Sequence, residues 1–370
     1  MVLALDCENT TWNTGNPFDI RNFNVCISYA TENSSGVVFE NREDFSRLFE
    51  QSTLLVGFNL KYDLHWLRKL GYDFSNKRVF DCQVAEYLLS RQTFRYPDLD
   101  TCAKKYTGEG KSTVVETEYW AKGINTHEIP RNILAEYAEK DALLTYRVYQ
   151  KQQELIPAHQ RILFSLTMQD LLVLQEMEYN GLHFDRELSL RKAHELETEI
   201  TELQTKLNIH HNVPDFNWGS VDHLSALLYG GTIKKDVRVP IGVYKSGKKE
   251  GEVRFKIETE TYNLPRKYTP VRGSALKKEG LFSVEEDYLR KLKGDHTLID
   301  GILRIKELAK KNNTYYNGLV DRQNEMNWPL DRIHGQFNQC VTSTGRLSSS
   351  KPSLQNFEGD VKEIFPSRFG

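Results

Sequence analysis

The chain has 370 residues, of which 39% are hydrophobic and 27% are charged. This composition supports a folded protein of two or three domains with ample core, and excludes a disordered chain. The formal net charge is only −2, so overall charge neither indicates nor excludes a nucleic-acid partner. Residues 1–157 hold 18 basic and 22 acidic side chains and the remainder hold 31 and 29, which weakly favours a metal-using enzyme joined to an anion-binding part.

Residues 1–157 alternate strand and helix patterns, beginning with a buried strand at Val2–Asp6. Further strands are predicted at 23–30, 37–40 and 54–57, and helices at 42–50, 60–70, 83–90, 99–106 and 133–152. Three strands in meander order, followed by strand–helix alternation, predict an α/β domain with helices on the faces of a mixed sheet.

After Pro157 the pattern changes to long amphipathic helices, expected at 187–207 and at about 298–322. Between them, residues 230–273 carry 11 basic and 5 acidic side chains and an alternating Val-Arg-Phe-Lys-Ile segment. We interpret this stretch as a basic β-hairpin or extended loop, which either contacts nucleic acid or is simply solvated. A strand at 332–341 is then expected to lead into a Thr-Gly-Arg-Leu-Ser-Ser-Ser segment.

Neither cysteine usage nor apolar runs indicate a secreted or membrane protein. No secretion signal precedes the first predicted strand, and no apolar run reaches membrane-spanning length. Five cysteines without zinc-ligand spacing are expected to be reduced core thiols: Cys7, Cys26, Cys82, Cys102 and Cys340. We therefore expect a cytoplasmic protein with no membrane partner.

Two acidic residues mark the end of the first strand. Asp6 and Glu8 are two apart, so they project from the same face where the strand leaves the core. Two such carboxylates repel each other and are costly to desolvate unless a cation joins them. For an isolated Asp-x-Glu an exposed, solvated strand end is the simpler explanation, so the assignment depends on residues further along the chain.

Three further side chains complete a candidate site. Asp63 is expected on the first turn of a helix that rises from the sheet edge, and Tyr137 and Asp141 lie four apart on one helix face. Each of these residues alone could be an ordinary exposed residue of a helix, but their order and spacing together are specific for a site. Asp81 also lies near, but we interpret it as the N-cap of the helix at 83–90.

The motifs Asp6-x-Glu8, Asn59-x-x-x-Asp63 and Tyr137-x-x-x-Asp141 resemble the three exonuclease motifs of family A (polymerase I-like) DNA polymerases. The resemblance continues through the linker, the thumb helix and the palm entrance of that family, at 174–185, 310–316 and 337–356. The last segment is similar to the signature Thr-Gly-Arg-Leu-Ser-Ser…Pro-Asn-Leu-Gln-Asn, with Ser353 in place of the usual Asn. The basic insertion after residue 231 is similar to polymerases of tailed phages.

The resemblance implies three parts: an RNase H-like 3′–5′ exonuclease domain at 1–157, a mainly helical thumb at 158–330 with the β insertion at 230–273, and an incomplete palm at 331–370. The Asp-Tyr-Ser and His-Asp motifs of the family do not occur in these residues. Polymerisation is therefore expected to need palm and fingers from a second polypeptide or the remainder of the chain. Without them, Ile364 and Phe365 are expected to be exposed.

The activity implied is proofreading hydrolysis of a single-stranded DNA 3′ end by two Mg²⁺ or Mn²⁺ ions. By resemblance, Asp6 bridges both ions, Glu8 and Asp141 hold the water-bearing ion, Asp63 reaches the other through water, and Tyr137 orients the attacking water. Contacts with the single strand and the primer–template duplex are expected from Asn59, Lys306, Lys310, Lys311, Arg346, Ser348, Gln355 and Asn356.

Two other interpretations stay open. A non-catalytic DNA-clamping subunit of a split polymerase would keep the fold but not the activity. A free-standing RNA-trimming exonuclease would share the acidic motifs, but the Thr-Gly-Arg-Leu-Ser-Ser segment has no purpose in it. The insertion at 230–273 is a candidate docking site for a processivity factor, and the infected bacterial cell is the expected location.

Overall fold

The computed structural model describes residues 1–213, 215–247, 250–357 and 359–367. It divides into two compact units: the first comprises Met1–Leu188 and Leu319–Gly370, and the second comprises Ser189–Gly318. Among the described residues, no helix is long and apolar enough to cross a membrane.

The first unit is built on a five-stranded sheet in the order β3-β2-β1-β4-β5. Strand β1 pairs antiparallel with β2 and parallel with β4, so the sheet is mixed, as predicted. The short β5 was not predicted. The strands are β1 (Val2–Asn9), β2 (Asn24–Ala30), β3 (Ser35–Val38), β4 (Leu54–Gly57) and β5 (Arg78–Asp81).

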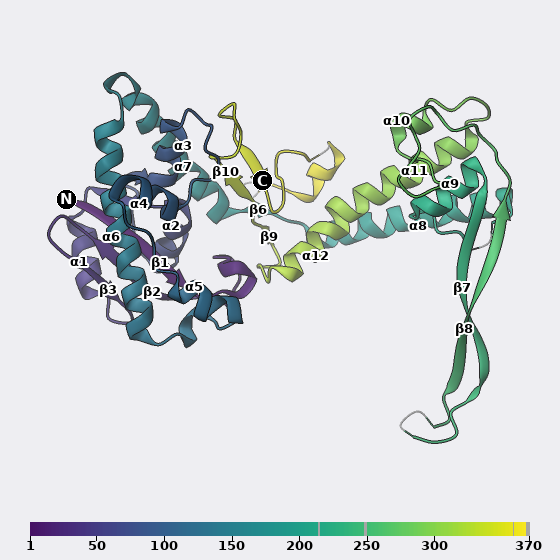
Figure 1. Cartoon of the computed structure of the whole chain (residues 1–370), viewed down its shortest axis with the longest axis horizontal. Coiled ribbons are helices and arrows are strands. Elements are labelled where there is room, and N and C mark those ends of the chain that lie inside the picture. Colours follow the sequence, from purple (N-terminus) through teal and green to yellow (C-terminus); the bar gives the residue numbers. More distant parts are fainter. Residues whose placement is uncertain (214, 248–249, 358, 368–370) are drawn as a thin grey trace. The chain divides into compact units, whose positions relative to one another are not determined.

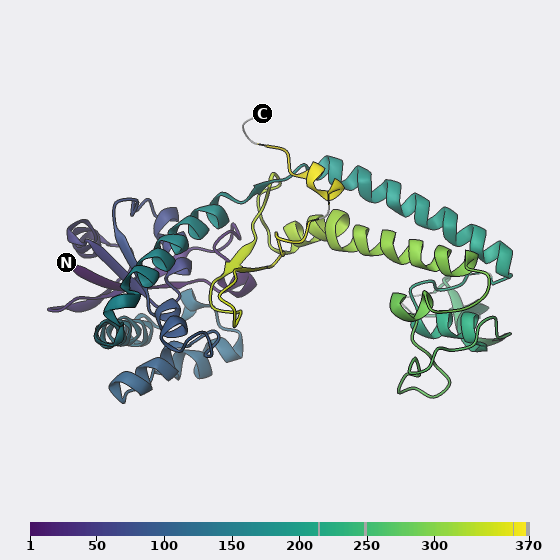
Figure 2. The same ribbon diagram turned by 90° about the horizontal axis from the view of Figure 1, so that it is seen from above.

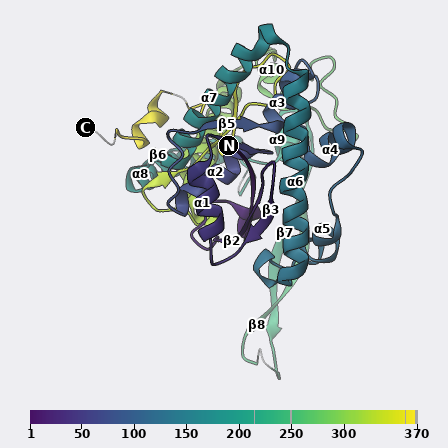
Figure 3. The ribbon, with the colours of Figure 1, turned by 90° about the vertical axis from the view of Figure 1, so that its left-hand side faces the viewer.

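Helices cover both faces of this sheet (Figure 3), with α6 on one side and α1 and α2 on the other. The β1–β2 register pairs Asp6 with Ser28 and Glu8 with Cys26, and Cys26 packs in one cluster with Tyr137 of α6. Asp6 and Glu8 therefore belong to the face that α6 covers. The helices of this unit before residue 188 are α1 (Glu43–Gln51), α2 (Leu60–Lys69), α3 (Cys82–Leu89), α4 (Leu99–Thr107), α5 (Val114–Glu118), α6 (Arg131–Leu155), α7 (Arg161–Asn180) and the short turns η1 (Trp12–Gly15), η2 (Trp120–Lys122), η3 (Thr126–Glu128) and η4 (Ala158–Gln160).

Asp81 is the N-cap of α3, as predicted, and its carboxylate accepts the backbone N–H groups of Gln83 and Val84. It also accepts those of Asn59 and Leu60, at 3.1 and 2.9 Å, and so fixes the start of α2. Burial raises the pKa of Asp81 to about 6, although these backbone donors oppose the shift. The five cysteines are free and buried, as expected.

The second unit contains two long helices that lie side by side (Figure 2), α8 (Arg186–His211) and α11 (Thr297–Lys311). They run antiparallel, because Leu207 contacts Gly301 while Glu199 pairs with Arg304. The predicted helix at 187–207 is thus present. The helix predicted at 298–322 is interrupted by a π-helical turn, η5 (Asn312–Tyr316), before α12 (Asn317–Glu325).

The basic insertion is a β-hairpin, one of the two forms expected. Strands β7 (Gly231–Val243) and β8 (Val253–Leu264) form a long twisted ribbon that follows α9 (Val221–Tyr229) (Figure 1). A short helix, α10 (Glu286–Leu289), precedes α11.

The last described segment differs from its prediction in two ways. The strand expected at 332–341 is split into β9 (Arg332–Ile333), which pairs with β6 (Leu182–His183), and β10 (Gln336–Asn338), which pairs with β11 (Ser348–Ser350). The expectation that Ile364 is exposed is wrong. Ile364 lies at the end of η6 (Asp360–Ile364), is 0% exposed, and its carbonyl accepts the N–H of Asp185 at 2.8 Å. Phe365 is half-buried, with its ring 4.7 Å from that of Phe357.

A buried Glu178 joins three segments of the first unit. Its carboxylate accepts Lys61 Nζ of α2 at 2.6 Å, His65 Nε2 of α2 at 3.0 Å and the backbone N–H of Phe337 of β10 at 2.5 Å. Its carbonyl accepts His334 Nδ1 at 2.9 Å. Burial opposes ionisation, but the His65 and Lys61 contacts outweigh it and lower the pKa of Glu178. His334 lies between β9 and β10, and its side chain points toward α7 to make the hydrogen bond with the Glu178 carbonyl.

Lowering the pH from 7 to 5 is expected to destabilise this region through His334. Burial lowers the pKa of His334 from 6.5 to about 4, so the unfolded chain binds a proton that the folded protein does not. Stability is therefore lost as the pH falls from 6.5 toward 4, by about 2 kcal/mol at pH 5. In a His334→Phe variant, which keeps an aromatic ring against Phe18, the loss of unfolding free energy between pH 7 and 5 should be smaller by that amount. An unchanged pH dependence would contradict a buried neutral His334.

Candidate active site

Three predicted carboxylates meet at the face of the sheet that α6 covers. Asp6, Glu8 and Asp141 each offer one oxygen atom, and these atoms lie within 4.8 Å of one another. We call these residues the carboxylate cluster. Asp6 and Glu8 meet there because alternate residues of a strand share a face, and α6 packs against β1 and β2 at that face.

The electrostatics of the carboxylate cluster favour a bound cation. Glu8 and Asp141 are 7% and 3% exposed, and burial raises the pKa of Glu8 well above its ordinary value and that of Asp141 to about 7. Asp141 Oδ1 is buried without a hydrogen-bond partner in the part of the chain that is described. Carboxylate oxygens are the ligands that Mg²⁺ and Mn²⁺ prefer, so the residues fit a hard divalent cation.

Asp63 lies next to the carboxylate cluster but not within it. Its Oδ1 accepts the backbone N–H of Cys7 at 3.0 Å, and it is 2% exposed. Strand β4 pairs only with Val2–Ala4, so the edge of β1 beyond Ala4 is free for this side chain of α2. Burial, followed by the nearby charge of Asp6, raises the pKa of Asp63 well above its ordinary value.

Tyr137 lies one helical turn before Asp141, as predicted, and is 3% exposed. Its hydroxyl donates to Glu116 Oε1 at 3.3 Å and accepts from Lys111 Nζ at 3.1 Å. Burial, with the charges of Glu8 and Asp141, raises the pKa of Tyr137. A neutral phenol is therefore held beside the carboxylate cluster, where it can orient a water molecule but not act as a base.

Lys111 is one of two residues at this site that the sequence did not reveal. It lies in the loop between α4 and α5, and its ammonium is 2.8 Å from Asp141 Oδ2. No spacing pattern connects a loop lysine with a helix residue thirty positions later, so no signal in the sequence could have found it. Glu116, 3.5 Å from the same ammonium, was missed for the same reason.

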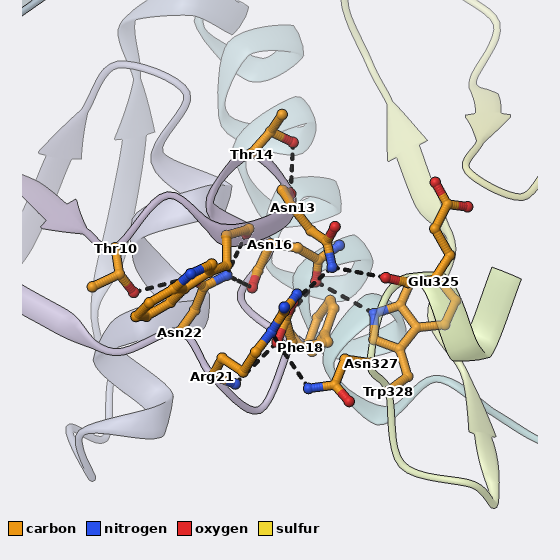
Figure 4. A network of polar contacts seen from close by, with 12 residues as sticks. Thr10, Asn13, Thr14, Asn16, Phe18, Arg21, Asn22, Glu325, Asn327 and Trp328 are labelled. Atoms are coloured by element: carbon orange, nitrogen blue, oxygen red, sulfur yellow. Dashed lines mark hydrogen bonds and ion pairs between the residues drawn. The ribbon is translucent and has the colours of Figure 1, made fainter. Parts of the chain in front are cut away.

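The loop that follows β1 is held by its own polar side chains (Figure 4). Asn22 accepts the hydroxyl of Thr10 at 2.9 Å and donates to the carbonyls of Trp12 and Asn16 at 2.7 and 2.9 Å. Asn13 in this loop has φ of 47°, in the left-handed region. These hydrogen bonds therefore hold the loop that follows Asp6 and Glu8 in one conformation.

The same loop is joined to the last residue of α12 and to the segment that follows it (Figure 4). Asn13 Nδ2 donates to the carbonyl of Glu325 at 2.9 Å and to Asp19 Oδ2 at 2.6 Å, and Asn327 Nδ2 donates to Asp19 Oδ1 at 3.2 Å. Burial opposes ionisation of Asp19, but hydrogen bonds from Arg21, Asn327 and Asn13 lower its pKa to about 2. The hydrogen bonds to Glu325 and Asn327 connect residues more than 300 positions apart.

A cavity of about 370 Å³ opens beside this loop. Its lining mixes polar and apolar surface and includes amide, cationic, acidic and aromatic side chains, among them Asn13, Asn59, Lys61, Tyr62, Glu178, Arg322, Glu325 and Lys351. Asn59 is exposed, precedes α2 and has φ of 63°. Asn59, one of the predicted DNA contacts, thus lines this cavity and directly precedes α2, the helix that carries Asp63.

The other predicted DNA contacts lie in both units. In the second unit Lys310 is exposed, whereas Lys306 is half-buried and donates to the carbonyl of Val284. In the first unit Arg346 is exposed and Ser348 lies on β11. The remaining three make local contacts or are partly covered: Lys311 is half-buried, Gln355 Nε2 donates to the carbonyl of Leu347 at 3.5 Å, and Asn356 Nδ2 donates to Ser353 Oγ at 3.1 Å.

Comparison with known proteins identifies two family regions. Residues 2–157 match the family described as 3′-5′ exonuclease, and residues 260–365 match DNA polymerase family A. DNA polymerase I of Borreliella burgdorferi is 24% identical over 85% of this chain and 30% of the relative. DNA polymerase I of Bacillus subtilis is 28% identical over 77% of this chain and 27% of the relative. DNA polymerase DpoZ of Acinetobacter phage SH-Ab 15497 is 24% identical over 98% of this chain and 56% of the relative.

Among solved structures, the POL domain of Pol1 from M. smegmatis, in complex with DNA primer-template and dNTP, has a similar fold. The TM-score is 0.64 at 17% sequence identity, covering 98% of this chain and 53% of that chain. The chain spans about 30% of the length of the bacterial relatives.

Proposed function

Because the chain belongs to family A of the DNA polymerases, with a 3′–5′ exonuclease domain at residues 2–157, we propose that it removes nucleotides from DNA 3′ ends by metal-dependent hydrolysis. The observation that carries this proposal is the carboxylate cluster, which gathers Asp6, Glu8 and Asp141 within 4.8 Å on that domain.

The residues present would hold two divalent ions, Mg²⁺ or Mn²⁺. Asp6 would contribute to both, Glu8 and Asp141 to one, and Asp63 to the other through water. When bound, such a pair activates a water molecule and stabilises the leaving 3′ oxygen. Tyr137 would orient that water through its hydroxyl, which Lys111 and Glu116 keep in place at 3.1 and 3.3 Å.

A single-stranded 3′ end is the substrate that the surroundings favour. The cavity beside Asn59 combines amide, aromatic, cationic and acidic side chains, and its Lys61 and Arg322 are paired with acidic residues of the same lining. Phosphate contact is therefore proposed for Lys351 and base stacking for Tyr62, neither of which requires a particular sequence. A paired end would have to fray first, so unpaired or mismatched ends are expected to react faster.

The family A match at residues 260–365 supports a polymerase subunit over a free-standing RNA-trimming enzyme. In this proposal residues 158–330 serve as the thumb, 331–370 begin the palm, and the predicted contacts hold the primer–template duplex. Palm and fingers would come from a second polypeptide or the remainder of the chain. The phage relative supports the cytoplasm of an infected bacterium as the place of action.

The proposal is tested with DNA oligonucleotides labelled at the 5′ end, incubated with the purified chain and Mg²⁺ or Mn²⁺. A ladder shortened from the 3′ end, formed faster on single strands than on matched duplex, is the expected result. With dNTPs and a primer–template, no extension is expected, since the residues lack the family's two palm motifs. Shortening from the 5′ end, or no shortening with either metal, would overturn the exonuclease assignment.

The hairpin β7–β8 is proposed to contact DNA or a processivity factor. Residues 230–273 have 11 basic and 5 acidic side chains, which attract phosphates. On one face of β8, Val253, Phe255 and Ile257 are 48%, 50% and 64% exposed, which suits a protein partner.

Replacing the hairpin by a short Gly-Ser turn is expected to weaken duplex binding about tenfold at low salt, because several phosphate contacts are lost. Hydrolysis of a short oligonucleotide should not change. Binding is measured by fluorescence anisotropy, with Arg238→Gln/Arg254→Gln/Lys256→Gln as the matched variant that keeps the strands but removes charge. Equal affinity of all three proteins for duplex DNA and for candidate processivity factors would make the hairpin a solvated ribbon.

A further inference from the structure

The loop between α4 and α5 carries Lys111 to a fixed position. The backbone N–H of Lys111 donates to Asp100 Oδ1 of α4 at 2.9 Å. A Cβ atom at Gly110 would lie 2.7 Å from the same oxygen and 2.7 Å from Cε of Lys104, so a larger residue here would make these two side chains shift. The hydrogen bond to Asp100 therefore ties the backbone of Lys111 to α4.

The ammonium of Lys111 is surrounded by acceptors. It lies 2.8 Å from Asp141 Oδ2, 3.1 Å from Tyr137 Oη and 3.5 Å from Glu116 Oε1. Of these, Asp141 and Tyr137 lie within hydrogen-bond distance, and Glu116 adds a longer ion pair. The side chain is only 21% exposed, in contrast with the surface pair of Lys122 and Glu118, which are 58% and 59% exposed.

The two oxygens of Asp141 have different surroundings. Oδ2 accepts Lys111, whereas Oδ1 is buried without a partner in the described part of the chain and belongs to a residue within 4.8 Å of Asp6 and Glu8. A divalent ion would add to the free oxygen while the ammonium keeps the other. The ion and the lysine would then share one carboxylate and repel each other at close range in a poorly solvated site.

We propose that Lys111 is the built-in counter-cation of the carboxylate cluster, which stabilises the metal-free protein and weakens metal binding through the shared carboxylate of Asp141. The inference rests on the proposed metal site. Because this coupling is reciprocal, Lys111 stabilises the metal-free protein more than the metal-bound protein by the same free energy by which it weakens metal binding. Removing the lysine is expected to make metal binding tighter and, through loss of the ion pair with Asp141, the metal-free fold less stable.

The test is Mn²⁺ titration by isothermal calorimetry without DNA, together with thermal unfolding with and without Mn²⁺. Lys111→Met removes the charge and keeps the chain length, Lys111→Arg keeps the charge, and Lys122→Met is the surface control. Lys111→Met is expected to bind Mn²⁺ about tenfold more tightly than the wild type and to unfold at a lower temperature without metal. Lys111→Arg and Lys122→Met should match the wild type in affinity to within about twofold. If Lys111→Met does not fold, Lys111→Gln, which is uncharged but can still donate to Asp141, is measured instead.

Unchanged or weaker Mn²⁺ binding by the uncharged variant overturns the inference and leaves the proposed function standing. If neither the wild type nor this variant binds Mn²⁺ at the carboxylate cluster, so that replacing Asp6 and Glu8 changes no titration, the proposed metal site fails and the inference fails with it.

Discussion

A variant with Asp6→Asn and Glu8→Gln is expected to release nucleotides from single-stranded DNA at least about a thousandfold more slowly than the wild type. Both side chains belong to the cluster that would hold the metal ions, and neutral amides cannot replace the charge that the ions need. Loss of the activated water and of leaving-group stabilisation together removes several kcal/mol from the barrier reduction. Single-turnover hydrolysis at saturating Mg²⁺ or Mn²⁺ is the measurement.

The same variant separates loss of chemistry from loss of fold. Burial raises the pKa of Asp6 and Glu8, which means that ionising them in the metal-free protein is unfavourable. The two amides carry no charge, so the cost of keeping buried carboxylates ionised disappears. At pH 8 without metal the variant should therefore unfold at the same temperature as the wild type or a higher one. Glu43→Gln/Asp44→Asn, an exposed pair at the start of α1, is the matched control and should be fully active. Activity within tenfold of the wild type in the Asp6/Glu8 variant would contradict the assignment.

Much of the site could be predicted because its residues follow short-range rules. The alternation of a strand places Asp6 and Glu8 on one face, and the helical repeat places Tyr137 and Asp141 on one side of α6. The capping role of Asp81 followed from its place before a helix. The hairpin, too, was one of the two forms that the alternating residues allowed.

The rest depends on contacts between distant segments, which no local pattern records. Asn13 reaches the carbonyl of Glu325, and Lys111 reaches Asp141 from a separate loop. The single strand predicted at 332–341 is two strands, because β9 pairs with β6 and β10 pairs with β11, which are different segments of the chain. Ile364 is fully buried and its carbonyl accepts the N–H of Asp185, a residue far away in the sequence, which no local pattern near the palm signature could indicate.

Replacing Glu178 by Ala is expected to destabilise the first unit by about 3–5 kcal/mol, the usual result of removing one partner of a buried ion pair. Lys61 would keep the carbonyl of Phe337 as an acceptor but lose its counter-ion. The backbone N–H of Phe337 and Nε2 of His65 would lose their acceptor. Equilibrium unfolding in urea measures the change.

The cost of a lone buried charge can be told apart from loss of packing by a second substitution. In Lys61→Met/Glu178→Leu no charge is left unpaired, so this variant should lose clearly less stability than Glu178→Ala, since apolar side chains of similar volume often replace a buried pair at little cost. Glu154→Ala, which breaks an exposed pair with Lys151, is the control and should change the unfolding free energy by less than about 0.5 kcal/mol. Equal losses in the single and the double variant would mean that packing, and not the pairing of charge, makes Glu178 important. Stability unchanged in Glu178→Ala would mean that α2, α7 and β10 are held together by their apolar contacts alone.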